Sequence, residues 1–138
     1  MSDVIRSKIN INNHDSFAYS LYPKMNDQRL PLVICLLEPG TEKYNIFLSA
    51  AVQGKYLCHV LVINSASPED WDNKYIRKAV QTLIYSLVSE YNMDDNRIYI
   101  TGEGIGAIGV CELNSAYPKI FAAAIPISGC GDPRAAFD

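Results

Sequence analysis

The sequence lacks the charge pattern of a nucleic-acid-binding protein. Lysine and arginine number 12 against 15 acidic residues, the net charge is −3, and only two histidines occur in 138 residues. A protein that binds nucleic acid normally carries a clustered excess of lysine and arginine, because these residues replace the counterions of the phosphates. No such cluster is present, so we expect no nucleic-acid partner.

Long apolar runs are also missing. The run from Leu57 to Ile63 is far too short to cross a bilayer, and the start of the chain lacks the basic and then apolar pattern of a signal peptide. We therefore expect no membrane partner and predict a cytoplasmic protein.

The four cysteines form no recognisable site. Cys35, Cys58, Cys111 and Cys130 are widely spaced, without a Cys-x-x-Cys pair or a Cys/His cluster, so neither a metal site nor another cofactor is expected. Free cysteines are usually buried as small hydrophobic residues, and we interpret these four as thiols in a reducing compartment.

What is present points to one compact domain over residues 1–138. The length matches a single domain, and residues of the hydrophobic class make up 49% of the chain, enough for a core. The segment from Ile5 to Leu21 alternates around Asn12–Asp15, which predicts two antiparallel strands. Continuous apolar runs of strand length, typical of parallel strands buried on both faces, follow at Leu32–Leu37, Cys58–Ile63, Arg97–Thr101 and Phe121–Ser128.

Two helices are predicted between these strands. Apolar residues recur at steps of three and four from Ile76 to Tyr91, with Asp72 or Asn73 available as the N-cap. A second helix is expected from about Ile105 to Tyr117, before Pro118. The alternation of strands and helices predicts an α/β fold of three layers, with a mostly parallel sheet and an antiparallel N-terminal edge.

A glycine-rich turn lies between the third parallel strand and the second helix. It reads Gly102-Glu103-Gly104-Ile105-Gly106, and a Tyr117-Pro118 pair and the alanine-rich strand from Phe121 to Ser128 follow it. With these flanks it resembles the nucleophile region of α/β-hydrolase esterases, in the branch of polyhydroxybutyrate depolymerases, feruloyl esterases and phospholipase/carboxylesterases. The resemblance reaches back through Leu30–Leu37 and Tyr19–Pro23, so it covers most of the chain. It implies a partial α/β-hydrolase fold, truncated after the region of the nucleophile.

The catalytic positions that the resemblance implies are altered. The elbow Gly-x-Ser-x-Gly of the family has Gly104 in place of serine, so no hydroxyl is available for attack. The oxyanion loop, usually His-Gly-Gly or His-Gly-Ala-Gly, reads Glu38-Pro39-Gly40, and proline has no N–H to donate. In this fold the catalytic histidine follows the nucleophile, yet no histidine follows Gly104. We interpret the elbow and the oxyanion loop as degenerate and predict no catalytic residue.

Other residues leave alternatives open. His59 is interpreted as a buried strand residue and His14 as a surface turn residue. Glu38 and Glu103 could together perform acid/base chemistry at the carboxyl edge of the sheet, although solvated loop charges are the simpler interpretation. Cys130 is a possible nucleophile by position only.

A nucleotide-binding site is a further alternative. Gly104, Gly106 and Gly109 form a literal G-x-G-x-x-G after a strand, and Asp132 lies near the place expected for a ribose-binding acid. The fingerprint normally belongs to the first βαβ unit, whereas two parallel strands precede it here.

The function predicted from these residues is that of a catalytically inactive hydrolase-like protein acting as a binding or structural subunit. The alternative is a serine esterase seen as a fragment or as a nucleophile variant. The strand from Phe121 to Ser128 would be an exposed apolar edge, which proteins normally cover or pair. We therefore expect a protein partner, or further copies of the chain in a homo-oligomer, to cover it.

Overall fold

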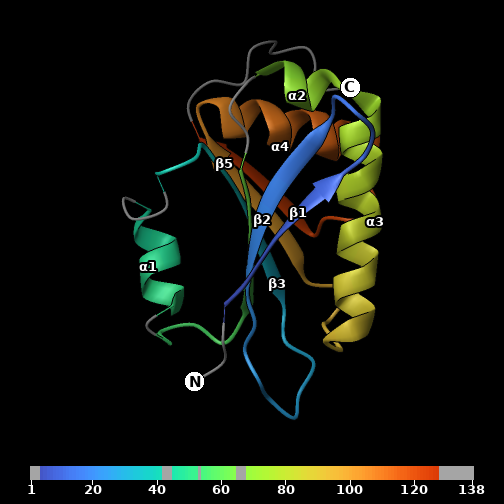
Figure 1. The fold of residues 1–138 in the computed structure, drawn as a ribbon. Helices are drawn as coiled ribbons and strands as arrows, with labels where there is room; N and C mark the ends of the chain where they lie inside the picture. The colour runs from blue at the N-terminus through green and yellow to red at the C-terminus, as the bar shows by residue number, and fades with distance from the viewer. Residues whose placement is uncertain (1–3, 42–44, 53, 65–67, 128–138) are drawn as a thin grey trace.

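The computed structural model describes residues 4–41, 45–52, 54–64 and 68–127 (Figure 1). These residues form ten elements: β1 (Ile5–Asn10), β2 (Ser16–Tyr22), β3 (Leu32–Leu37), α1 (Ile46–Val52), β4 (His59–Asn64), α2 (Pro68–Asp72), α3 (Lys74–Glu90), β5 (Ile98–Glu103), α4 (Ile105–Ala116) and β6 (Ala123–Ile127).

The described strands form one sheet in the order β1-β2-β4-β3-β5-β6. β1 pairs with β2 and β2 with β4 in antiparallel orientation, while β4, β3, β5 and β6 are mutually parallel. The predicted antiparallel edge and four parallel strands are thus confirmed. Because β3 lies between β4 and β5 and is parallel to both, the loops after β3 and β5 meet at the carboxyl edge of the sheet.

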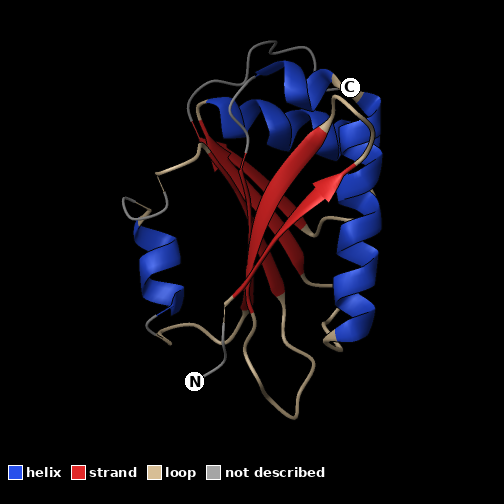
Figure 2. Cartoon of the chain, viewed as in Figure 1, coloured by secondary structure: helices blue, strands red, loops and turns tan. Residues whose placement is uncertain are grey.

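Helices cover both faces of the sheet. Figure 2 shows α1 on one side and the other three helices on the opposite side. Parallel strands need such cover because both of their faces are apolar. The sequence Leu32-Val33-Ile34-Cys35-Leu36-Leu37 illustrates this requirement, since five of its six residues are buried.

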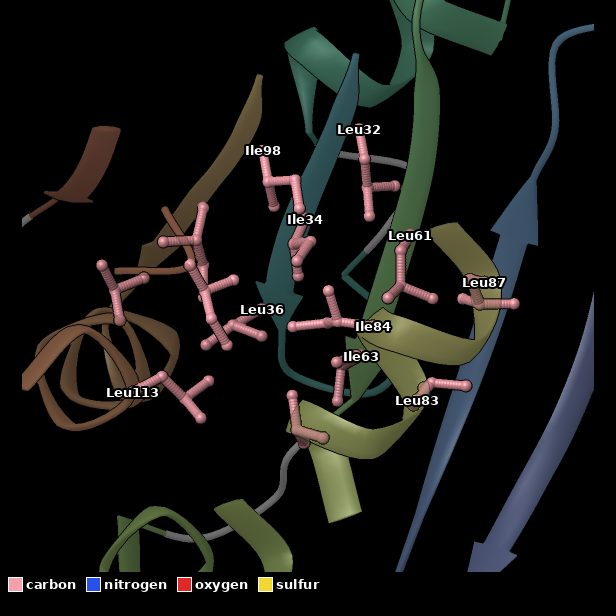
Figure 3. Packing of buried hydrophobic residues seen from close by; sticks show 14 of the residues in the cluster. Leu32, Ile34, Leu36, Leu61, Ile63, Leu83, Ile84, Leu87, Ile98 and Leu113 are labelled. Carbon is pink, nitrogen blue, oxygen red and sulfur yellow. The ribbon is translucent and has the colours of Figure 1, made fainter. Parts of the chain in front are cut away.

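The larger core lies between the sheet and α2, α3 and α4. Figure 3 shows Leu36, Ile63, Ile84 and Leu113 converging there from two strands and two helices. A smaller cluster lies on the α1 side and contains Cys35, Leu37, Leu48, Cys58, Val60 and Val62. It involves β3, β4 and α1 but no residue of β5 or β6.

Helix α3 follows the predicted pattern closely. Its buried residues recur every three or four positions, and its N-cap is Asn73, whose side chain accepts hydrogen bonds from the amides of Tyr75 (2.9 Å) and Ile76 (3.4 Å). The side-chain NH₂ group of Asn73 also donates to the Asp15 carboxylate at 3.0 Å, and this hydrogen bond connects the β1–β2 turn to the helix.

Two short helices were not anticipated from the sequence. Helix α1 reads Ile-Phe-Leu-Ser-Ala-Ala-Val, and α2 spans five residues. Helix α1 has no charged face that would reveal a period of 3.6, and α2 is too short to show one. Within α2, Trp71 is only 1% exposed and packs against α4 at Gly109.

Candidate functional site

The glycine-rich turn forms a sharp junction between strand and helix. β5 ends at Glu103, Gly104 has φ +63° and ψ −120°, and α4 begins at Ile105. This φ lies in the region that residues with a Cβ rarely adopt. The predicted elbow is therefore present as a backbone shape, and the residue at its apex is glycine.

The neighbouring glycines have packing roles. A Cβ on Gly102 would lie 2.6 Å from the backbone of Gly106, and a Cβ on Gly106 would lie 2.0 Å from the carbonyl oxygen of Leu36 in β3. A Cβ on Gly109 would lie 2.6 Å from the ring of Trp71. All three residues are buried, so the close approach of α4 to β3, β5 and α2 accounts for these glycines without a nucleotide.

The loop after β3 is a tight turn rather than a row of free donors. The Thr41 amide donates to the Glu38 carbonyl at 3.2 Å, Pro39 occupies the second position and Gly40 has φ +83°. Proline at the second and a positive-φ glycine at the third position are the features of a type II turn. The Thr41 hydroxyl also donates to the Glu38 carbonyl, at 2.7 Å. Pro39 has no N–H to donate to a ligand, and the N–H of Thr41 is already bonded within the turn.

These two loops enclose a pocket at the carboxyl edge of the sheet. Its volume is about 270 Å³, and its lining residues come from the β3 loop, the β5–α4 elbow and the start of α1: Leu37, Glu38, Thr41, Asn45, Glu103 and Gly104. The predicted elbow and oxyanion loop therefore do meet in space. Thr41 and Asn45 were not identified from the sequence, because no motif marks residues that follow a strand by several positions.

The polar groups of the pocket are mostly hydrogen-bond acceptors. Glu38 and Glu103 are both exposed, and Glu38 Oε1 lies 3.6 Å from the place that a Cβ on Gly104 would occupy. The Thr41 hydroxyl hydrogen is used in its turn, and Asn45 Oδ1 accepts from the Leu48 amide at 2.8 Å. Among the described lining residues, only the NH₂ group of Asn45 adds side-chain donors.

Both histidines lie away from this pocket. His59 begins β4, five residues before the level of the pocket, which corresponds to about 16 Å along the strand. It is 3% exposed, its Nδ1 accepts from the Lys24 amide at 3.0 Å, and burial lowers its pKa, so the ring is neutral. His14 is exposed in the β1–β2 turn, and two strands separate β2 from β5. The interpretations of His59 as buried and His14 as a surface residue are confirmed.

The cysteines correct one prediction. Cys35 and Cys58 are free and buried, and burial raises the pKa of Cys35 to about 12, with a smaller contribution from Cys58. Cys111 is instead disulfide-bonded, so the prediction of four thiols is wrong at this position. Its partner lies outside the described residues, as do Cys130 and Asp132. The wide spacing of the four cysteines gave no indication of the pairing.

Two further searches cover the part of the chain that the structure describes. It contains no group of three or more His, Cys, Asp or Glu residues able to hold a metal ion. None of its helices combines the length and apolar character required to span a bilayer.

The fold resembles those of solved esterases. A thermostable esterase is 29% identical with a TM-score of 0.71, and the match covers 98% of this chain and 43% of that one. An acetyl xylan esterase from Aspergillus awamori is 16% identical with a TM-score of 0.66, covering 89% and 51%. An enterochelin esterase from Shigella flexneri is 15% identical with a TM-score of 0.65, covering 84% and 33%. No protein-family model matches the sequence, and no curated protein is significantly similar to it.

These similarities confirm the predicted fold class. The chain has a mixed six-stranded sheet with helices on both faces, an α/β fold of the kind found in α/β-hydrolase esterases. It spans about half or less of the length of each of these three structures.

Proposed function

We propose that this chain is a hydrolase-like protein without serine-esterase activity that serves as a binding or structural subunit of an assembly. The observation that carries the proposal is Gly104 at the apex of the elbow, where the esterase mechanism requires a hydroxyl. The surroundings of Gly104 support the same conclusion.

The charge of the pocket opposes ester hydrolysis. A tetrahedral intermediate places a negative charge beside the nucleophile, which esterases stabilise with N–H donors. Here Glu38 brings a carboxylate to within 3.6 Å of the Cβ position at residue 104. Two like charges at about 4 Å repel by about 1 kcal/mol in water and about 4 kcal/mol near a protein surface. Each 1.4 kcal/mol in the barrier corresponds to about tenfold in rate.

The base of a triad is also missing from the described pocket. His59 lies at the opposite edge of the sheet and has its Nδ1 engaged by the Lys24 amide. No other described side chain beside Gly104 has the properties of an imidazole base, because the neighbouring titratable groups are the carboxylates Glu38 and Glu103.

The assembly role is supported by the exposure of β6. Ile125 and Ile127 are 54% and 48% exposed, and β6 is the last strand of the described sheet. Apolar edge strands are normally covered, so a partner or a second copy at β6 would remove this surface from water.

A serine esterase, present as a piece or as a nucleophile variant, is the second candidate. The backbone shape at Gly104 favours it, because the elbow is retained and a Cβ there would make an ordinary 3.6 Å contact with Glu38. On this view a serine at residue 104 fits the space, although its backbone would be strained.

The two candidates differ in the activity of Gly104→Ser. We expect the purified wild-type chain and Gly104→Ser both to hydrolyse p-nitrophenyl acetate at the rate of Gly104→Ala, which carries the same backbone strain without a hydroxyl. Saturable turnover by Gly104→Ser, absent from Gly104→Ala, would favour the esterase. Light scattering separately tests the proposed assembly role. A folded monomer at micromolar concentration would contradict that role.

A further inference from the structure

The open face of β6 continues into the pocket. Glu103 in β5 is aligned with Ile127 in β6, and Thr101 with Ile125. Side chains alternate along a strand, so these four share one face of the sheet. Ile100 and Ala124, one position away, belong to the core under α4, which places the shared face on the α1 side.

Helix α1 does not extend over this part of the sheet. The cluster beneath it contains no residue of β5 or β6, and among the described residues no element packs on the α1 side of Ile125 and Ile127. Figure 1 shows the one described helix on that side beside the sheet, away from α4. The result is an exposed apolar strand face that ends at an acidic pocket.

The backbone of β6 favours side-chain docking over addition of a long strand. The Ile127 carbonyl accepts from the Gly104 amide at 3.3 Å, and the Ile125 carbonyl accepts from the Thr101 hydroxyl at 3.0 Å. Pro126 between them has no N–H. Both carbonyls point toward β5, so the backbone of Pro126 points to the outer side of β6 and leaves that side without an N–H where another chain would pair.

The pocket complements a single long cation. Its volume of about 270 Å³ is below the roughly 300–1,000 Å³ of small-molecule sites. Glu38 and Glu103 accept only, and the described residues that line the pocket include no lysine or arginine. Arginine suits this surplus of acceptors, because its guanidinium has five donors, no acceptor and a fork that matches carboxylates.

We propose, on the basis of the binding role above, that this surface docks a partner segment in which apolar side chains covering Ile125 and Ile127 are followed by an arginine or lysine that enters the pocket between Glu38 and Glu103. The apolar contact supplies area, and the cation fixes the register. Charge complementarity favours this occupant over a second copy packed β6 against β6, because β6 carries no charged residue that could enter the acidic pocket of a neighbour.

The probe is a phage-displayed library of random 12-residue peptides, panned against the full 138-residue chain. We expect the enriched peptides to share an apolar pair beside a basic residue. A synthetic peptide of that sequence should bind at least tenfold more weakly to the double variant Glu38→Gln/Glu103→Gln and to Ile125→Ser, and more weakly at high salt. Glu90→Gln and Leu57→Ser, which alter an exposed acid and an exposed apolar residue elsewhere, should bind as the wild type does.

Several results would overturn the proposal. These are no enrichment, a consensus without a basic residue, or binding that the Glu38 and Glu103 variants leave unchanged. The chain could instead form a dimer that Ile125→Ser abolishes and Glu38→Gln/Glu103→Gln leaves intact. That result would assign the face to a second copy. Binding of Ca²⁺ or Mg²⁺ that is lost in the double variant would assign the acidic pair to a metal. None of these results depends on esterase turnover, which tests the proposed lack of activity separately.

Discussion

The two buried glycines of α4 allow a quantitative test of how the elbow is held. Alanine at either position adds one methyl group inside the same helix, but the methyl groups meet different obstacles. At Gly106 the new Cβ would lie 2.0 Å from the backbone oxygen of Leu36, which can move only if α4 separates from β3. At Gly109 it would meet the ring of Trp71 at 2.6 Å and Leu36 Cδ1 at 2.7 Å, which are side-chain atoms that can shift.

The expected losses of stability follow from these contacts. Overpacking in a core typically costs about 1–3 kcal/mol, and removing a helical glycine returns up to about 1 kcal/mol. We therefore expect Gly109→Ala to destabilise the protein by about 0–2 kcal/mol and Gly106→Ala by about 3 kcal/mol or more. With a urea m-value of about 1–3 kcal/mol/M, the larger loss lowers the unfolding midpoint by about 1–3 M.

Trp71 makes the measurement direct. It is the only tryptophan in the sequence and is buried against α4, so its fluorescence reports unfolding of this layer. Ser115→Ala, at an exposed position near the end of α4, is the matched control and should stay within about 0.5 kcal/mol of the wild type. An equal loss for Gly106→Ala and Gly109→Ala, or a neutral Gly106→Ala, would refute the close approach of α4 to β3.

Two further predictions concern ionisable side chains. Because burial lowers the pKa of His59 below 6.5, the unfolded chain binds its proton at a higher pH than the folded one, so stability is complete above about pH 6.5 and falls as the pH drops through the folded pKa. Urea midpoints measured between pH 4.5 and 7.5 should decrease with falling pH in the wild type and in the control His14→Asn. The decrease should be smaller in His59→Asn. An equal decrease in all three proteins would contradict the buried neutral ring. Without reductant, titration of the denatured protein with Ellman's reagent should find two thiols, Cys35 and Cys58, and after reduction it should find more. Reaction of all four cysteines without reductant would contradict the disulfide at Cys111. Because disulfides persist mainly in oxidising compartments, the count also tests the predicted cytoplasmic location.

Much of the fold could be predicted because its signals are local. β3 and β4 are apolar at nearly every position, whereas a half-exposed strand alternates apolar and polar residues. Helix α3 shows a clear period of 3.6 residues and has Asn73 as its N-cap. The elbow was located because strand, glycines and helix follow one another directly along the chain. Helix α1 was missed because all its residues are apolar or small, which leaves no period to detect.

The pocket depends on contacts between distant segments, so only part of it could be predicted. Glu38 and Glu103 were placed at the carboxyl edge by the rule for parallel sheets. Their shared pocket requires β3 to lie beside β5, and that strand order is set by packing of the whole sheet rather than by any local pattern. Thr41 and Asn45 were identified only from the structure, in which both line the same pocket as Gly104.

The most direct test of the proposed lack of serine-esterase activity is the intact mass of the chain after incubation with a fluorophosphonate. This reagent forms a stable adduct with an activated serine, which Gly104 cannot supply. We predict an unchanged mass at a reagent excess that labels an active esterase completely. Stoichiometric addition of one phosphonyl group, mapped to any residue around the pocket of Glu38 and Glu103, would contradict the account.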